Sequence, residues 1–398
     1  MADRSHLIAD AQRYLVPTYG RPPFVLDHGR GAEVWDADGR RYLDFVAGIA
    51  VNALGHAHPA VVETIMREAP RLIHTSNLYH TAPAIELARL LVESCFADKV
   101  FFTNSGTEAV EGAFKFARKV ARERHGEGKH AIVAFEGAFH GRTMGAVAAT
   151  HREKYRDPYM PVMPGVRFAP FNDLDGAARM IDDDVCAVIV EPVQGEGGIT
   201  PATDAFLQML QEQCDAHEAL LIVDEIQCGA GRTGELWAYS SSGIKPDLMC
   251  VAKPLGGGLP IGAILTTDAV AEHLHPGDHG STFAGGPLVC AVALAVFREL
   301  SSPALLAHVR EIGGYLGERL EVLRHEDAHV REIRGFGLMR GVRVAGSAAA
   351  VRDAAQEAGL LLVPAGEDVI RIVPPLIIER EHVDEAVSIL RHALEVLA

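Results

Sequence analysis

The sequence has no continuous apolar run of about 18 residues, the length that a helix needs to cross a lipid bilayer. Its first residues, MADRSHLIADAQRY, contain no apolar core of the kind found in secretory signals. These two absences predict a soluble, cytoplasmic protein that has no membrane partner.

Basic residues are few relative to acidic ones. The 398 residues include 37 Lys and Arg against 53 Asp and Glu, which gives a formal net charge of −16. This balance argues against nucleic acid or an anionic membrane surface as a partner, because both attract basic proteins. A local basic pocket for an acidic small molecule remains compatible with the composition.

Two common kinds of cofactor motif are also missing. The six cysteines include no pair with metal-ligand spacing, so we expect no metal site and reduced, mostly buried thiols. There is no GxxxxGK(S/T) motif and no GxGxxG motif after the first strand. This argues against P-loop and dinucleotide-binding proteins.

From Lys99 onward, apolar runs of strand length alternate with helical patterns. The alternation predicts an α/β fold, with a large domain whose mostly parallel sheet is flanked by helices on both faces. We expect a smaller α+β domain built from both ends of the chain. The predicted segments are 1–75 (an N-terminal arm and part of the small domain), 76–285 (the large domain) and 286–398 (a linking helix and the rest of the small domain).

Individual helices follow from apolar periodicity and from Pro, Gly and capping signals. The first should lie within residues 1–20 and end at a turn near Pro17. The others are expected at 59–72, 84–95, 106–125, 203–217, 284–324, 348–358 and 381–397.

Two charged side chains follow apolar strands in the middle of the chain. Asp224 comes directly after the run 220–223, and Lys253 follows the run 248–251. Ligands of open α/β sheets bind beyond the carboxyl ends of the strands, so both side chains could reach one pocket. We predict that Lys253, its pKa lowered by apolar neighbours, is a Schiff-base lysine, and that Asp224 is the anionic partner of a cofactor ring nitrogen. Taken singly, a solvated lysine and an aspartate that caps a turn or pairs with Arg232 are simpler interpretations.

The segment Asn104–Thr107 lies between a predicted strand and a predicted helix. Free backbone N–H groups, small hydroxyl side chains and the positive end of the helix would make this segment an anion site suited to a phosphate. The alternative is an ordinary N-cap followed by Glu108 in the first turn.

Two further polar segments follow strands. In Phe139–Arg142, the aromatic ring could stack on a planar cofactor and the guanidinium of Arg142 could hold a carboxylate. The alternative is a core phenylalanine and a surface arginine, with His140 as a structural histidine. In Glu191–Gly198, Glu196 could pair with an arginine of the site, or could be a solvated loop acid.

These motifs, in this order, resemble the class III aminotransferases of fold type I, which use pyridoxal 5′-phosphate (PLP). The resemblance covers nearly the whole chain, and within the class it is closest to the subfamily that acts on N-acetylornithine. The segments that carry it are NSGTEAVEGAFKFAR, AFHGRTMGA, EPVQGEGG, LLIVDEIQCGAGRTG, AKPLGGGLPIGA, HGSTFAGGPL, RGFGLMRG, RIVPPL, PTYGRPP, AGIAVNALGHAHP and SNLYH.

The resemblance implies a role for each residue that holds the cofactor. Lys253 would form the Schiff base with the cofactor aldehyde and later move a proton, while Asp224 stabilises the protonated ring nitrogen. Gln227 would contact the 3′-oxygen of the ring, and Phe139 would stack on its face. Ser105, Gly106 and Thr107 would hold the phosphate, with Thr282 reaching it from the second subunit of a homodimer that shares its active sites.

The resemblance also implies the substrates. Arg142 would bind the α-carboxylate of N-acetylornithine, whose terminal amine is transferred in arginine biosynthesis. Arg371 would bind the α-carboxylate of glutamate or 2-oxoglutarate, and Glu196 would mask it in the other half-reaction. Ser281 is assigned to the substrate with these three residues.

Two positions depart from the family pattern. The family often has Gly-Asn-Pro at Gly285–Pro287 and Ala-Asn-Glu at Ala109–Glu111, where this chain has Gly286 and Val110 in the middle position. Ile49 supports the N-acetylornithine subfamily, because relatives specific for free ornithine resemble this stretch but carry a tyrosine there.

Several other activities share these motifs. Succinylornithine, ornithine, 4-aminobutyrate and a carrier-linked lysine are alternative amine donors. The last usually goes with a serine in place of His140. A PLP-dependent aminomutase and a metabolite-binding protein without activity are alternatives from other classes, although Lys253 and Asp224 argue against the second.

Overall fold

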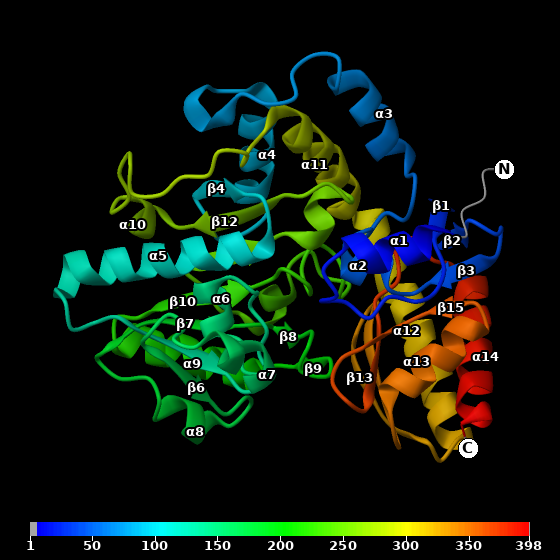
Figure 1. The fold of residues 1–398 in the computed structure, drawn as a ribbon. Coiled ribbons are helices and arrows are strands. Elements are labelled where there is room, and N and C mark those ends of the chain that lie inside the picture. The colour runs from blue at the N-terminus through cyan, green and yellow to red at the C-terminus, as the bar shows by residue number, and fades with distance from the viewer. Residues whose placement is uncertain (1–5, 398) are drawn as a thin grey trace.

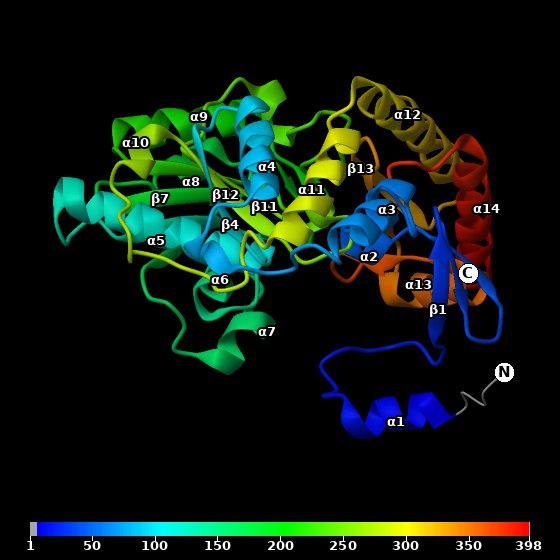
Figure 2. The same ribbon diagram turned by 90° about the horizontal axis from the view of Figure 1, so that it is seen from above.

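The computed structural model describes residues 6–397, which form a large lobe and a smaller lobe. The large lobe contains a seven-stranded sheet, and both described ends of the chain lie in or beside the smaller lobe (Figure 1). The expected first helix is α1 (His6–Tyr14), which projects away from the rest of the chain (Figure 2); residues 1–5 of that prediction lie outside the described part.

The seven strands of the large sheet confirm the expected α/β class. Their order is β4 (Lys99–Thr103), β12 (Gly262–Thr266), β11 (Leu248–Val251), β10 (Leu220–Asp224), β7 (Val185–Val190), β5 (Ala131–Phe135) and β6 (Val166–Ala169). Neighbours from β11 to β6 are parallel, whereas β12 runs antiparallel to both β11 and β4. The connection from β11 to β12 holds only the short 3₁₀ helix η4 (Lys253–Gly256), which lacks the length of a crossover helix.

The sheet is buried on both faces, as continuous apolar strands predict. Leu221 and Val223 face a core formed with α4 (Ala82–Glu93), α9 (Asp204–Ala216) and α11 (Pro287–Leu300). Ile222, between them, faces the opposite core, formed with α5 (Gly106–His125). Side chains alternate along each strand, so one strand supplies both cores while its carboxyl end stays free to carry polar groups.

The smaller lobe contains two four-stranded sheets. One joins the N-terminal strands β1 (Leu26–Arg30), β2 (Glu33–Asp36) and β3 (Arg41–Asp44) to β15 (Leu360–Leu361). The other contains β13 (Val330–Phe336), β14 (Met339–Val344), β17 (Val369–Ile372) and β16 (Val363–Pro364). The pairing of β3 with β15 supports the proposal that both termini build the small domain; its boundaries near residues 75 and 285 remain a prediction.

The long helical stretch expected at 284–324 is two helices. Ser301 and Ser302 interrupt it, and α12 (Pro303–Glu326) starts with proline at a position that needs no N–H partner. The helix predicted at 59–72 is also shorter, because α3 ends at Glu68. Among residues 6–397 no single helix could cross a membrane; only α11 and α12 together have the required length and composition, and they are bent by 61°.

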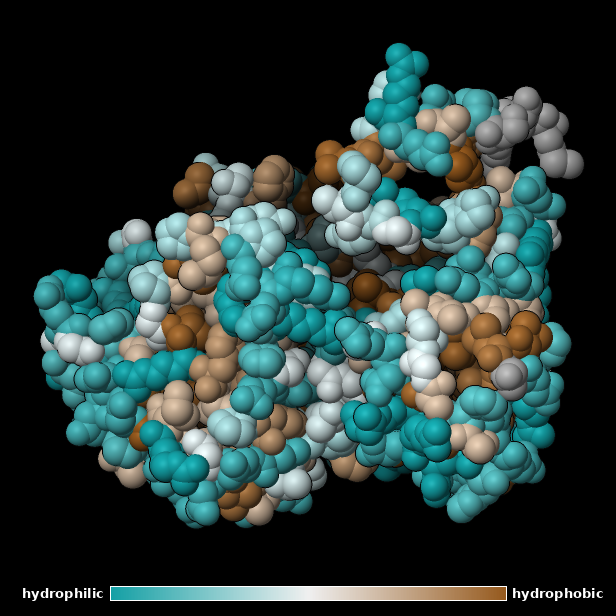
Figure 3. Space-filling view, turned by 60° about the horizontal axis from the view of Figure 1, so that its bottom comes forward, coloured by the Kyte–Doolittle hydropathy of each residue, from teal (hydrophilic) through white to brown (hydrophobic). Residues whose placement is uncertain are grey.

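The remaining elements are short or close to their predicted bounds. The helices are α2 (Ala47–Ala50), α3 (Pro59–Glu68), α6 (Met144–Ala148), α7 (Glu153–Arg156), α8 (Leu174–Ala178), α10 (Asp268–Ala271), α13 (Ala348–Glu357) and α14 (Arg380–Val396), and the remaining strands are β8 (Val193–Gln194) and β9 (Thr200–Pro201). All six cysteines are free thiols, and five of them are buried. Hydrophilic residues predominate on the face seen in Figure 3.

Candidate active site

A cavity of about 440 Å³ lies where several strands of the large sheet end. It collects eight of the residues that the sequence assigned to cofactor or substrate: Ser105, Gly106, Thr107, Phe139, Arg142, Asp224, Gln227 and Lys253. Strands that are distant in the chain supply these residues, so the rule that ligands bind at the carboxyl ends of strands holds here.

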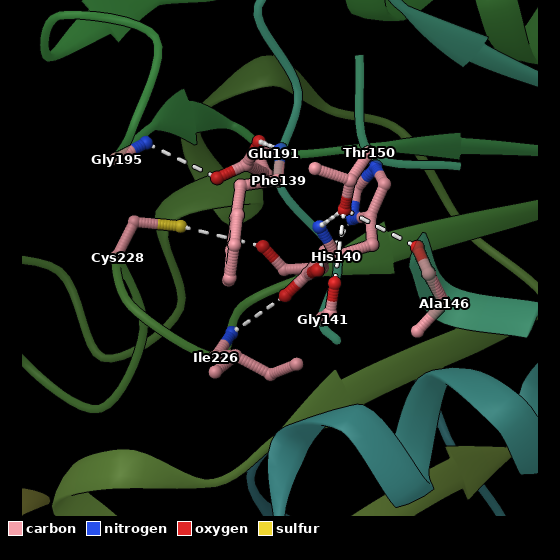
Figure 4. Close-up of polar contacts among 10 residues, drawn as sticks. Phe139, His140, Gly141, Ala146, Thr150, Glu191, Gly195, Ile226 and Cys228 are labelled. Carbon is pink, nitrogen blue, oxygen red and sulfur yellow. Dashed lines mark hydrogen bonds and ion pairs between the residues drawn. The ribbon is translucent and has the colours of Figure 1, made fainter. Parts of the chain in front are cut away.

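Asp224, the last residue of β10, is 3% exposed and pairs with His140. Its Oδ2 atom lies 2.7 Å from His140 Nδ1, and its Oδ1 atom accepts a hydrogen bond of 3.0 Å from the backbone N–H of Ile226 (Figure 4). Burial lowers the pKa of His140, but the hydrogen bond and charge of Asp224 outweigh it, so the pKa lies above its ordinary value. The pair orients one carboxylate of the cavity and balances its charge.

Arg232, the alternative partner of Asp224, points elsewhere. Its guanidinium is buried and donates to the backbone carbonyl groups of Leu338 and Pro374, in the small lobe. Burial lowers the pKa of Arg232 to about 9. The interpretation of Asp224 as its ion-pair partner is therefore wrong, whereas the turn-capping interpretation describes one of its two oxygens.

Lys253 begins η4, directly beyond β11. Burial, reinforced by the positive charge of Arg371, lowers its pKa to about 8, against the opposing effect of nearby carboxylates. Its backbone φ angle of 25° lies in the left-handed region, which is unfavourable for a residue with a side chain and is often found at functional sites. A neutral amine is therefore accessible near physiological pH, and the backbone holds it at one place in the cavity.

The N-terminus of α5 has the geometry that an anion site requires. Ser105 is the N-cap, and its hydroxyl accepts a hydrogen bond of 3.3 Å from the N–H of Glu108. The first N–H groups of a helix have no intrahelical partner, and Gly106 and Thr107 carry these groups into the cavity wall. The capping and anion-binding interpretations are thus compatible: the N–H of Glu108 bonds to the capping hydroxyl, whereas the N–H groups of Gly106 and Thr107 remain available to an anion.

Phe139 and Arg142 also line the cavity, on a loop that contacts α5, since the hydroxyl groups of Thr143 and Thr107 lie 2.8 Å apart. The guanidinium carbon of Arg142 is 3.5 Å from the ring centroid of Tyr155 and 5.5 Å from that of Phe139. The side chain is exposed, and stacking on Tyr155 orients its N–H groups; no acidic side chain among residues 6–397 pairs with it. Such an arginine is prepared to bind a carboxylate.

A second arginine lies behind Gln227. Arg371, on β17, is 1% exposed; its Nη1 atom is 2.6 Å from Glu196 Oε1 and donates to Gln227 Oε1 at 3.1 Å. Its Nε atom is buried and has no partner among the described residues. Glu196 and Arg371 therefore form the predicted type of pair, and Gln227 keeps its amide N–H groups for the cavity.

Four predicted residues lie outside the cavity lining of the single chain: Glu196 and Arg371, which pair with each other, and Ser281 and Thr282. Thr282 is exposed and Ser281 lies beside it, outside the cavity lining. Ser281 Oγ accepts a hydrogen bond of 2.9 Å from Asn104, which places this loop next to the phosphate-type site of α5.

Two cavity residues, His140 and Glu191, and the ring of Tyr155 beneath Arg142 make contacts that the sequence does not predict. His140 was left as a structural histidine, Tyr155 was not singled out, and Glu191 was quoted only as the start of a loop. Glu191 lines the cavity, and it follows β7 as Asp224 ends β10, so the same strand-end pattern could have identified it. No comparable sequence pattern marks Tyr155.

The comparisons agree with this geometry. The model of the family described as "Aminotransferase class-III" matches residues 14–394. The chain is 48% identical to the mitochondrial acetylornithine aminotransferase of Alnus glutinosa (97% of this chain, 87% of that one) and to a succinylornithine transaminase of Salmonella agona (93% and 92%). The ornithine aminotransferase of Toxoplasma gondii has a similar structure, with a TM-score of 0.94 and 32% identity over 100% of this chain and 96% of that one.

The chain therefore belongs to the class III aminotransferase family and is a PLP-dependent transaminase of fold type I. A further structure of the Toxoplasma gondii enzyme shows partial occupancy of PLP at its active site.

The residues of this cavity fit PLP. A half-buried primary amine, a buried carboxylate and a helix N-terminus line one space, and they match the aldehyde, the ring nitrogen and the phosphate of the cofactor. Within residues 6–397, no group of three or more His, Cys, Asp or Glu side chains is placed to hold a metal ion.

Proposed function

We propose that this transaminase moves the terminal amino group of N-acetylornithine to 2-oxoglutarate, giving N-acetylglutamate 5-semialdehyde and glutamate. The observation that carries the proposal is that two different arginines act near one lysine: Arg142 lines the cavity that contains Lys253, and the charge of Arg371 reaches that lysine from outside the lining. Arg142 is open and stacked on Tyr155, whereas Arg371 is closed by Glu196. The two substrates carry their reacting amines at different distances from the α-carboxylate: N-acetylornithine at the far end of the chain, and glutamate on the α-carbon. Two carboxylate sites of different accessibility suit this difference.

The protein groups divide the chemistry among them. When bound, PLP supplies an aldehyde and a ring that accepts electrons from the substrate carbon. Lys253 offers an amine with a lowered pKa, which can bind the aldehyde and carry a proton between neighbouring carbons. With PLP bound, Asp224, oriented by His140, would hold the proton of the ring nitrogen, and Phe139 would shield one ring face from water.

The two arginines set which amine reaches Lys253. Arg142 at the mouth binds the α-carboxylate of N-acetylornithine, so the distant terminal amine reaches the reacting centre. Arg371 lies deeper, and a diacid displaces Glu196 from it and brings its own α-carbon to the same place. Ser281, beside Asn104, completes the substrate wall.

N-succinylornithine is the second candidate donor. Its extra carboxylate requires another cation near Arg142, and the mouth provides two: Arg152 and Lys154 lie 6.0 and 5.2 Å from the ring centroid of Tyr155. Ornithine, 4-aminobutyrate and a carrier-linked lysine remain weaker alternatives, as does an aminomutase reaction, which needs no 2-oxoglutarate.

The functional unit of this proposal is a homodimer with shared active sites. The segments 72–79 and 281–286 adjoin each other, since Asn77 donates to the carbonyl of Ser281 at 3.0 Å and His74 packs on Phe283 at 5.2 Å. Their exposed apolar residues include Leu78 and Phe283, 79% and 70% exposed. A second copy would cover this surface and bring its Thr282 to the phosphate. The six free thiols support a reducing compartment such as the cytoplasm, where arginine biosynthesis would employ the reaction.

A panel of amine donors tests the proposal. Purified protein with PLP is assayed with N-acetylornithine, N-succinylornithine, ornithine and 4-aminobutyrate, each with and without 2-oxoglutarate, and glutamate is measured. We expect the highest kcat/KM for N-acetylornithine and no product without the keto acid. A higher kcat/KM for a donor without an acylated α-amine would overturn the assignment, and product from one substrate alone would indicate an aminomutase.

A further inference from the structure

Glu191 joins two loops that enter the cavity from different parts of the chain. Its carboxylate accepts a hydrogen bond of 3.1 Å from the N–H of Phe139 through one oxygen and a second of 3.1 Å from the N–H of Gly195 through the other (Figure 4). The residue directly follows β7 and is 6% exposed. A single side chain therefore fastens both loops at the cavity wall.

The carboxylate is held there without a basic partner. Within residues 6–397 Glu191 takes part in no ion pair closer than 4.0 Å; burial raises its pKa to about 7, and the charge of nearby His140 opposes this shift. A buried acid of this kind is unfavourable for stability unless its oxygens are fully used.

The two loops carry different parts of the proposed machinery. Phe139 is the aromatic residue of the cavity wall, and Gly195 immediately precedes Glu196, whose carboxylate closes Arg371. The backbone carbonyl of Glu196 also accepts a hydrogen bond of 2.6 Å from Arg152. The backbone on both sides of the Gly195–Glu196 peptide is thus tied to other loops, and a displacement of Glu196 by a substrate acts on this loop.

We propose that Glu191 is a positioning residue that couples the Glu196–Arg371 pair to the aromatic wall at Phe139. The coupling rests on the proposed function in one respect, namely that a diacid opens Arg371. When the diacid displaces Glu196, the shift of the 194–198 loop is transmitted through the carboxylate of Glu191 to the 137–142 loop. The wall that faces the cofactor thereby responds to which substrate occupies the site.

Glu191→Gln is the discriminating variant. The amide has nearly the shape of the carboxylate, but only its oxygen can accept, so one of the two N–H groups loses its partner. Glu225→Gln is the matched control. Glu225 is also buried and accepts from two backbone N–H groups, those of Ala238 and Tyr239 at 3.0 and 2.7 Å, but it lies outside the cavity lining.

Amide hydrogen exchange of the full chain, followed by mass spectrometry, measures the coupling directly. Wild type, Glu191→Gln and Glu225→Gln are compared with and without glutarate, a five-carbon diacid without a reactive group. In wild type and Glu225→Gln we expect glutarate to change exchange in both the 137–142 and 194–198 loops. In Glu191→Gln we expect about tenfold faster exchange in at least one loop without ligand, and a glutarate response confined to 194–198.

Two results would overturn the coupling: unchanged exchange in both loops of unliganded Glu191→Gln, or a two-loop glutarate response in that variant. Failure of the proposed function looks different. Glutarate would then leave exchange in wild type unchanged, while the comparison of unliganded proteins would still decide whether Glu191 holds the two loops. Steady-state kinetics provide a second measurement of the coupling. Glu191→Gln should change KM for 2-oxoglutarate more than KM for N-acetylornithine, and Glu225→Gln should change neither.

Discussion

The environment of a single carboxylate decides what it contributes to this protein. Asp224, Glu191 and Glu225 are all buried at strand ends of one sheet, yet each has a different partner. Asp224 has an imidazole at 2.7 Å, Glu191 has two N–H groups from cavity loops, and Glu225 has two N–H groups away from the cavity. The sequence predicts that each carboxylate lies at the end of a strand. The hydrogen-bond partner, which the sequence does not predict, determines what each carboxylate does.

Replacing His140 tests whether it orients Asp224. His140→Ala removes the donor at 2.7 Å, and the loss of a hydrogen bond to a charged group, about 1.5–3 kcal/mol, predicts a kcat lower by roughly ten- to a hundredfold. In His140→Asn the amide nitrogen can take the place of Nδ1, so we expect partial recovery. The measurement is kcat with saturating N-acetylornithine and 2-oxoglutarate. Full kcat in the alanine variant, or an asparagine variant no better than alanine, would contradict this role.

Glu225 should make stability depend on pH. Burial raises its pKa to about 7 from 4.5, so the folded state binds a proton more tightly than the unfolded state. Its stabilising contribution is complete below pH 4.5 and is lost as the pH rises through about 7, a change on the order of 3 kcal/mol. The stability difference between wild type and Glu225→Gln should therefore be largest at pH 5 and shrink towards pH 8. Denaturant unfolding at both pH values checks this, and parallel pH profiles would contradict it.

The sequence predicted which residues enter the cavity better than it predicted their partners. Asp224 and Lys253 were identified because a charge directly after an apolar strand is locally visible. The contact between His140 and Asp224 joins residues 84 positions apart and depends on how β5 and β10 pack beside β7. Tyr155 under Arg142 was not predictable for the same reason, since its ring is brought there by the short helix α7.

At the scale of elements, the N-terminus of α5 is the part of the fold that a cofactor phosphate would use. Ser105→Ala removes the N-cap of this helix, which typically lowers stability by about 1 kcal/mol. Ser302→Ala is the matched control, because Ser302 is the N-cap of α12 and lies outside the cavity lining. Its hydroxyl accepts a hydrogen bond of 3.2 Å from the backbone N–H of Leu305.

Both serine variants should lose similar stability, but only Ser105→Ala should bind PLP more weakly, by about tenfold. Thermal unfolding and titration of the apoprotein with PLP, followed by absorbance, provide the two values. Equal PLP affinities in the two variants would show that the end of α5 does not hold the phosphate.

The ends of some helices are predictable from local sequence signals alone, and others are not. The helix expected at 106–125 matches α5, because Ser105 and Gly126 mark its ends, and the predicted helix 348–358 is close to α13. The break at Ser301–Ser302 was missed because apolar periodicity continues across it into α12. The antiparallel β12 was not specified, since strand direction depends on the length of a connection and not on the strand's own residues.

At the scale of the whole molecule, shared active sites predict complementation between two inactive variants. In a mixed dimer of Lys253→Ala and Thr282→Asp chains, one site has both substitutions and the other has neither. Mixing the two proteins under conditions that exchange subunits should therefore restore activity, up to about half of the sites in each mixed dimer. The measurement is turnover against mixing ratio, with sedimentation to confirm the dimer. Absence of any gain, while subunits exchange, would contradict sharing.

The central claim is that Lys253 is the group to which the cofactor becomes attached in this cavity. Borohydride reduction of the PLP-loaded protein, followed by digestion and mass spectrometry, locates the attachment directly. We expect loss of the yellow colour and a single modified peptide carrying Lys253, with no modification and no turnover in Lys253→Ala. A modified peptide from another lysine, or full turnover in Lys253→Ala, would contradict the account.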